Sequence, residues 1–132
     1  MEVDTTQRVL VIEDNPNLRK VLVNIVRKIG YGQVSEADDG FPAWDLIQTG
    51  EVDLVLADWS MPGLNGLELL KKIRKAKPPI CNIPFLMITA LDTKEAIVQA
   101  AQTGVDAYVI KPFSVATIAD KIREAVEKRA NS

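Results

Sequence analysis

The 132-residue chain contains no histidine and only one cysteine, Cys81. Without histidine, the chain alone cannot form a Ser-His-Asp or Cys-His catalytic arrangement, a zinc site with imidazole ligands, or a phosphohistidine. One cysteine cannot form an intrachain disulfide, which is consistent with a reducing compartment and a cytoplasmic location. Any chemistry must therefore come from carboxylates, hydroxyls and lysines, together with a metal ion that prefers oxygen ligands.

Long apolar runs and a strong net charge are also absent. No apolar segment approaches the roughly 20 residues that span a bilayer, and the polar tail at residues 1–7 lacks the apolar core of a signal peptide. The net charge is −2, so nothing favours nucleic acid or an anionic membrane as a partner. The composition is 47% hydrophobic and 26% charged, which is typical of a globular domain, and the length fits one domain over residues 1–132.

Four short apolar runs alternate with segments whose apolar residues have helical spacing, and they predict strands at residues 9–12, 54–57, 85–88 and 107–110. A fifth, weaker strand is predicted at residues 33–37, where only Val34 and Ala37 are apolar. Most of these runs show no polar alternation, which is typical of strands that are covered on both faces. The alternation of strands and helices predicts an α/β fold, in which five helices cover both faces of a five-stranded parallel sheet.

The predicted helices also carry local signals. We expect Ala43, Leu46 and Ile47 to face inward from the second helix, which follows the turn at residues 38–40. Asp92, with Glu95 three residues later, is typical of a capping box at the start of the fourth helix. The third helix has a basic face that we expect to be solvated: Lys71, Lys72, Arg74 and Lys75.

Four of the predicted strands end next to side chains that can do chemistry. In chain order, these side chains are Glu13 and Asp14, Asp58, Thr89, and Lys111. Because the carboxyl ends of parallel strands meet at one edge of a sheet, we expect the four ends to converge. Two carboxylates ~4 Å apart repel by about 4 kcal/mol at an effective dielectric constant near 20, so three of them favour a bound cation. Oxygen ligands of this kind suit Mg²⁺.

Such a site can transfer a phosphoryl group. Asp58 would attack phosphorus as a carboxylate nucleophile, Lys111 would neutralise one phosphoryl oxygen, and Thr89 would donate a hydrogen bond to another. Each residue alone has a simpler interpretation as a turn, cap or surface residue. The hypothesis depends on the convergence of all four strand ends.

These motifs resemble those of the receiver domains of two-component response regulators, most closely the single-domain chemotaxis members. The resemblance covers about residues 8–127. It is carried by Glu-Asp at 13–14, DWSMPG at 58–63, GLELL at 66–70, MITA at 87–90 and YVIKPF at 108–113.

The resemblance implies a flavodoxin-like three-layer sandwich with strand order 2-1-3-4-5, as a single receiver domain over residues 1–132 without an output domain. It implies that Asp58 accepts a phosphoryl group from a histidine kinase in a magnesium-dependent reaction. Asp14, Asp58 and the main-chain carbonyl of Ser60 would bind Mg²⁺ directly, and Glu13 would act partly through water. The peptide bond before Pro112 is expected to be cis.

The resemblance also implies a switch. Thr89 would move toward phosphorylated Asp58, Tyr108 would rotate inward, and the face of the fourth helix, fifth strand and fifth helix would bind a target such as a flagellar motor switch protein. Ser60 and Leu91 occupy the positions that tune the lifetime of the aspartyl phosphate. Leu91 is apolar where a polar or charged side chain is common, and we expect it to hinder attack by water.

The chain would then be a monomer that catalyses its own phosphorylation and slow autodephosphorylation, without being a conventional turnover enzyme. A phosphorelay intermediate or phosphate sink without a motor target is the alternative, since it needs the same site. A metal-dependent phosphatase is less favoured, because Ser60 stands where such an enzyme has an acid or base. A scaffolding pseudo-receiver is less favoured because Asp58, Thr89 and Lys111 are all present.

Overall fold

Five strands form one parallel sheet in the order β2-β1-β3-β4-β5, as the resemblance implied. The computed structural model describes residues 4–131, so the first three residues of the expected tail at 1–7 lie outside the described part. The strands are β1 (Arg8–Ile12), β2 (Gln33–Ala37), β3 (Leu54–Ala57), β4 (Phe85–Thr89) and β5 (Ala107–Ile110). The five strand predictions are confirmed to within one residue at each end.

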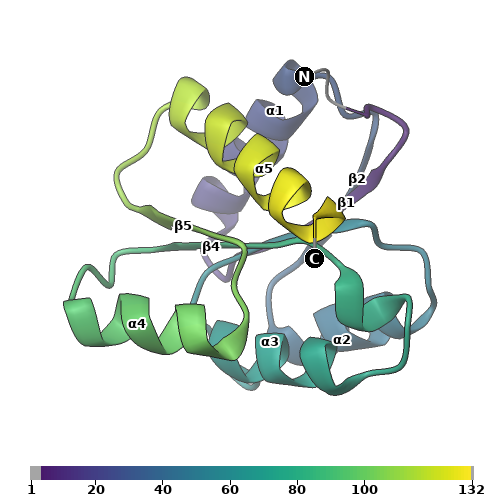
Figure 1. Cartoon of the computed structure of the whole chain (residues 1–132). Coiled ribbons are helices and arrows are strands. Elements are labelled where there is room, and N and C mark those ends of the chain that lie inside the picture. The colour runs from purple at the N-terminus through teal and green to yellow at the C-terminus, as the bar shows by residue number, and fades with distance from the viewer. Residues whose placement is uncertain (1–3, 132) are drawn as a thin grey trace.

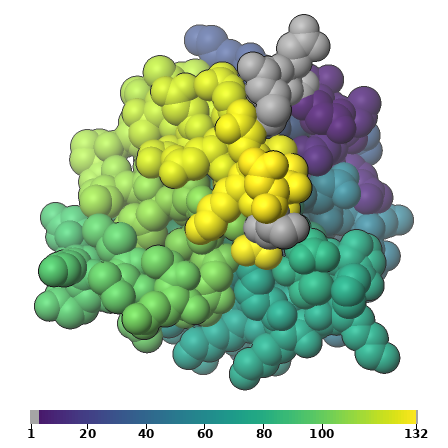
Figure 2. Space-filling view, viewed as in Figure 1, coloured from purple at the N-terminus to yellow at the C-terminus, as the bar shows by residue number. Residues whose placement is uncertain are grey.

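Helices cover both faces of this sheet. They are α1 (Pro16–Ile29), α2 (Gly40–Gln48), α3 (Gly66–Lys75), α4 (Lys94–Thr103) and α5 (Val115–Ala130), with a short 3₁₀ helix, η1 (Ile80–Asn82), before β4. In Figure 1, α1 and α5 lie on one side of the sheet, and α2, α3 and α4 lie on the other. The space-filling view from the same side shows α4 and α5 as adjoining parts of the surface (Figure 2). No helix within residues 4–131 is long and apolar enough to cross a membrane.

The sheet separates two apolar clusters. Side chains alternate between the two faces of a strand, so Leu10 and Ile12 enter one cluster while Val9 and Val11 enter the other. All four of these β1 side chains are at most 1% exposed. Burial on both faces is the reason that β1, β3 and β4 are continuous apolar runs, whereas the edge strand β2 is largely exposed.

The side chains of two asparagines and one serine cap the starts of three helices. The Oδ1 atom of Asn15 accepts hydrogen bonds from the main-chain nitrogens of Asn17 and Leu18, at 2.9 and 3.1 Å. Asn65 forms a capping box with Glu68, and Ser114 caps α5.

The cap predicted for α4 was wrong. Thr93, not Asp92, accepts the hydrogen bond from the Ala96 nitrogen, at 3.2 Å. The helix begins one residue later than the sequence suggested, at Lys94. Asp92 and Thr93 are both good capping residues, so local sequence alone could not choose between them.

Two predicted side-chain directions were also wrong. Leu46 is 37% exposed. α2 turns Ala43 and Ile47 toward the sheet, and Leu46, one residue before Ile47, then points about 100° away from it. Arg74 is not part of a solvated basic face. Its guanidinium group reaches past the end of α3 and donates to the main-chain oxygens of Gly104, Cys81 and Ile83.

The partner that draws Arg74 inward is Asp106, whose side chain is fully buried at the start of β5. The Asp106 carboxylate accepts from Arg74 Nη2 at 2.7 Å, Arg129 Nε at 2.8 Å and the Phe85 nitrogen at 2.9 Å. One acid therefore joins α3, β4, β5 and α5 at the amino-terminal ends of the strands. A buried charge of this kind is tolerated only with such a complete set of partners.

We predict that Asp106→Ala lowers the free energy of unfolding by about 3–5 kcal/mol, because it leaves two partly buried guanidinium groups without their shared partner. Urea denaturation measures this change. The control is Asp120→Ala, which removes a carboxylate that is 73% exposed and pairs with Arg123. We expect the control to change the unfolding free energy by less than about 0.5 kcal/mol. Equal effects of the two substitutions would contradict the role given to Asp106.

Candidate functional site

Three acids meet at the carboxyl edge of the sheet. Glu13, Asp14 and Asp58 each place one carboxylate oxygen within 4.8 Å of the others. β1 and β3 pair in parallel with Ile12 opposite Ala57, so the residues that follow these two strands lie side by side. Glu13 and Asp58 are only 2% and 7% exposed, whereas Asp14 is exposed. The acidic group that the sequence predicted is therefore present, with two of its acids buried and one exposed.

Lys111 reaches this acidic group from the end of β5. Its Nζ atom lies 2.6 Å from Asp58 Oδ2 and 2.9 Å from Glu13 Oε1. Burial alone would lower the pKa of Lys111, but the hydrogen bonds to Asp58 and Glu13 outweigh it and raise the pKa. The ammonium group therefore stays charged at neutral pH. The peptide bond between Lys111 and Pro112 is cis, as expected.

Glu13 is the acid most affected by burial. Burial raises the pKa of Glu13, hydrogen bonds from Lys111 and the Asn15 nitrogen oppose this rise, and the nearby Asp14 and Asp58 add to it. Because the pKa is higher in the folded state, the stabilisation that comes from protonated Glu13 is complete below its unfolded-state pKa and is lost as the pH rises through the folded-state value. At neutral pH, the ionised side chain costs folding free energy, and a cation beside it would reduce that cost.

The loop between β3 and α3 holds Asp58 in place through two close backbone approaches. The Ser60 nitrogen donates to Asp58 Oδ1 at 3.1 Å, and the Gly66 nitrogen donates to the Trp59 oxygen at 2.9 Å. A Cβ atom on Gly66 would collide with the main-chain oxygen of Asp58, and one on Gly40 would collide with that of Leu64. Glycine is therefore required where α2 and α3 begin against this loop.

Thr89, Tyr108 and Leu91 lie at the same edge. Thr89 ends β4, next to β3 in the sheet, and is 1% exposed. Its hydroxyl oxygen accepts a hydrogen bond from the Leu91 nitrogen at 3.3 Å. The Tyr108 hydroxyl donates to the Leu91 main-chain oxygen at 2.6 Å, so both side chains contact the segment between β4 and α4. Burial, together with the negative charges of Asp58 and Asp92, raises the pKa of Tyr108.

Sequence reasoning missed two contributors to this edge, the Arg19 side chain and the main-chain nitrogen of Asn15. The Arg19 Nη1 atom donates to the main-chain oxygen of Glu13 at 2.8 Å. Its position one turn beyond the Asn15 cap was the available signal, since helical side chains lean toward the start of their helix. The Asn15 nitrogen, which donates to Glu13 Oε2 at 3.1 Å, was likewise not predicted to hold Glu13.

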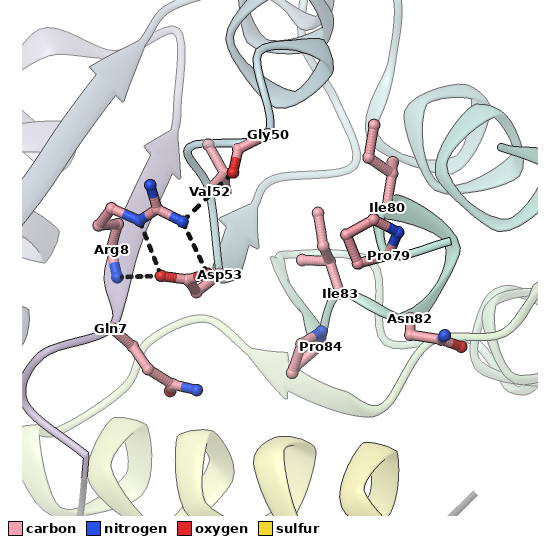
Figure 3. A pocket seen from close by; sticks show the side chains of 10 residues that line it. All are labelled: Gln7, Arg8, Gly50, Val52, Asp53, Pro79, Ile80, Asn82, Ile83 and Pro84. Carbon is pink, nitrogen blue, oxygen red and sulfur yellow. Dashed lines mark hydrogen bonds and ion pairs between the residues drawn. The ribbon is translucent and has the colours of Figure 1, made fainter. Parts of the chain in front are cut away.

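A hollow of about 310 Å³ lies at the opposite ends of the strands, and its side chains do not form a comparable site. Figure 3 shows Arg8 and Asp53 paired with each other, with the Gln7 and Asn82 side chains on different sides of the hollow. Arg8 Nε and Asp53 Oδ2 are 2.9 Å apart, which neutralises both charges. The rest of the lining is largely apolar, from Val52, Pro79, Ile80, Ile83 and Pro84.

The fold and the acidic edge together define a class of protein, the flavodoxin-like α/β domains with a carboxylate and lysine site at the ends of β1, β3 and β5. The chain belongs to the response regulator receiver domain family, and the model of that family matches residues 9–123.

Relatives agree with this assignment. The chemotaxis protein CheY-3 of Vibrio cholerae is 40% identical over 121 residues, which cover 92% of this chain and 92% of that protein. The structure of a CheY-like receiver domain protein from Methanospirillum hungatei matches with a TM-score of 0.83 and 26% identity, over 96% of this chain and 98% of that one. The receiver domain of a sensor histidine kinase from Pseudomonas aeruginosa, with a magnesium ion coordinated in its active site cleft, matches with a TM-score of 0.82 and 27% identity, over 92% and 98% of the chains.

The close approach at Gly66 leads to a prediction. Gly66→Ala should lower the free energy of unfolding by about 1–3 kcal/mol, because the new methyl group must displace the backbone at Asp58. It should also change the emission of Trp59 in a Trp44→Phe background, in which Trp59 is the only tryptophan. Gly32→Ala is the matched control, since a Cβ atom there meets nothing within 4 Å. The account of the loop fails if both variants match the parent in stability and emission.

Proposed function

We propose that this protein is a phosphorylation-dependent response regulator, which accepts a phosphoryl group on Asp58 from a histidine kinase in a magnesium-dependent reaction. The observation that carries the proposal is the contact of one ammonium group, Lys111 Nζ, with both Asp58 and Glu13 inside an acidic group. Neutralising charge and positioning oxygen atoms are most of what phosphoryl transfer requires from a protein. Membership of the receiver family supports the same reaction.

The donor atoms fit Mg²⁺. They are hard carboxylate oxygens, and the exposed Asp14 leaves the group open to water on one side. Asp14, Asp58 and the Ser60 main-chain carbonyl would hold the ion, with Glu13 acting partly through water. When bound, the ion would offset the negative charge of the carboxylates and of the incoming phosphoryl group.

The chain's own residues then have defined roles. An Asp58 carboxylate oxygen forms a bond to phosphorus as the bond from phosphorus to the donor histidine nitrogen breaks, and the imidazole leaves with the electron pair. Lys111 exchanges its contact with the Asp58 oxygen for one with a phosphoryl oxygen. The buried Thr89 hydroxyl donates a hydrogen bond to another phosphoryl oxygen, which draws Thr89 toward Asp58.

The output is a change in the face formed by α4, β5 and α5. Thr89 and Tyr108 both contact the segment at Leu91, so movement of Thr89 changes the surroundings of Tyr108 and lets it rotate inward. These three elements carry exposed apolar side chains suited to a protein partner, Val98, Ile110 and Val115, and Leu91 is exposed in the segment just before α4. We propose that a monomeric single receiver domain in the cytoplasm uses this face to bind a target, with a flagellar motor switch protein as the candidate. The similarity to CheY-3 supports a role in chemotaxis.

A phosphorelay intermediate is the second candidate. The similarity to the receiver domain of a sensor histidine kinase favours it, because that domain comes from a kinase and not from a chemotaxis protein. The two candidates share the acceptor site and differ in what the phosphorylated chain does next. Transfer of labelled phosphate from the chain to a histidine phosphotransfer protein, without a stable complex with a target, would favour the relay.

Asp58→Asn should abolish labelling by acetyl phosphate in the presence of MgCl₂, because an amide oxygen is not a competent nucleophile for phosphorus. Intact-mass measurement after incubation detects the added phosphoryl group. Asp38→Asn, which alters an exposed acid in the turn after β2, is the control and should label like the parent. A parent protein that is not labelled, or an Asp58→Asn variant that is, would refute the assignment of the acceptor.

Leu91→Glu should shorten the lifetime of the phosphorylated protein several-fold, because a carboxylate beside the acceptor can orient water that the leucine side chain excludes. The decay of the phosphorylated fraction after removal of the donor measures this lifetime. Val98→Glu provides the control, since it places the same charge on an apolar residue of α4 that is similarly exposed. Equal decay in Leu91→Glu and the parent would show that Leu91 does not control access of water.

A further inference from the structure

Arg19 joins three elements at the edge of the acidic site. It lies in the second turn of α1, and its side chain is 20% exposed. Nη1 donates to the main-chain oxygen of Glu13 at 2.8 Å, and Nε donates to Glu36 Oε1 in β2 at 3.1 Å. The guanidinium group therefore links the start of α1 to the ends of β1 and β2.

The Glu13 carbonyl needs this donor because β2 stops providing partners at this point. The Glu13 nitrogen donates to the Ala37 oxygen at 3.0 Å, which continues the pairing of β1 with β2 by one residue. β2 ends at Ala37, and the chain then turns into α2, whose cap is Asp39. Arg19 supplies the hydrogen bond that a longer strand would have supplied.

With this bond, Glu13 is held at all of its polar groups. Its nitrogen contacts Ala37, and its side-chain oxygens accept from Lys111 Nζ and the Asn15 nitrogen. Its main-chain oxygen accepts from Arg19. That oxygen belongs to the peptide group that joins Glu13 to Asp14, so the Arg19 bond fixes the plane of this peptide and the direction in which Asp14 leaves the sheet.

We infer that Arg19 is a positioning residue that orients the Glu13–Asp14 peptide and thereby strengthens binding of a divalent cation by the acidic site. The inference rests on the proposed function, because it assumes that the site takes such a cation. Arg19 acts through the backbone and does not occupy a carboxylate oxygen of Asp14 or Asp58. Groups that orient metal ligands in this way commonly contribute strongly to metal affinity.

The sign of the effect separates positioning from simple electrostatics. A positive charge near the acids repels a cation, so removing the Arg19 charge would tighten Mg²⁺ binding if charge were its only influence. If Arg19 positions Asp14, its removal weakens binding. Glu36 offsets part of the Arg19 charge, which further reduces the electrostatic contribution.

The test is a MgCl₂ titration of Trp59 emission in the Trp44→Phe background. Arg19→Met should raise the dissociation constant for Mg²⁺ by about tenfold. Arg19→Lys keeps the charge but loses the guanidinium group that contacts both Glu13 and Glu36, so it should also raise the dissociation constant for Mg²⁺. Arg27→Met removes the same charge from an exposed position on α1, and should leave the dissociation constant unchanged or slightly lower. Circular dichroism confirms that each variant is folded, and Arg19→Lys provides the test should Arg19→Met not fold.

Labelling by acetyl phosphate gives a second measurement. Its dependence on the MgCl₂ concentration would not change if Arg19 only stabilised the fold. The MgCl₂ concentration for half-maximal labelling should rise in Arg19→Met, while the rate at saturating MgCl₂ stays close to that of the parent. Binding in Arg19→Met that is as tight as in the parent, or tighter, would overturn the inference and leave the proposed function standing. A parent protein without a saturable response to MgCl₂ would overturn both.

Discussion

Repulsion among Glu13, Asp14 and Asp58 is the constraint on which the rest of this structure depends. The order of the strands forces the acids together, because β1 and β3 are neighbours and both end in carboxylates. Burial makes the repulsion worse by removing water, and it raises the pKa of Glu13. Lys111 offsets part of the charge from the end of β5. A single ammonium group among three acids still leaves the site with an excess of negative charge, which favours a cation.

At the amino-terminal edge of the same sheet, buried and half-buried acids are paired with arginines. There two acids are paired in this way, Asp53 with Arg8, and Asp106 with Arg74 and Arg129. These pairs tie the ends of the strands to the helices and to one another. These two acids have their own cationic partners, whereas Glu13 and Asp58 at the carboxyl edge share one lysine.

The fold and the acidic site could be predicted from the sequence because both follow from long-range regularities. Apolar runs covered on both faces identify parallel strands, and the ends of such strands meet wherever they lie in the chain. The wrong predictions concerned single side chains. The destination of Arg74 depended on Asp106, which is 32 residues away and has no periodic signal. The choice between Asp92 and Thr93 as the cap of α4 depended on where the preceding loop turns.

The most direct test of the central claim is the free energy of unfolding of Asp14→Asn and of the parent protein, measured by urea denaturation with and without MgCl₂. The account predicts that, without MgCl₂, the variant is the more stable of the two by on the order of 1 kcal/mol, because one repelling charge is gone. It also predicts that MgCl₂ stabilises the parent and has little effect on the variant, since the cation binds only the folded acidic site. A variant that is less stable than the parent without MgCl₂, together with a parent that does not respond to MgCl₂, would contradict it.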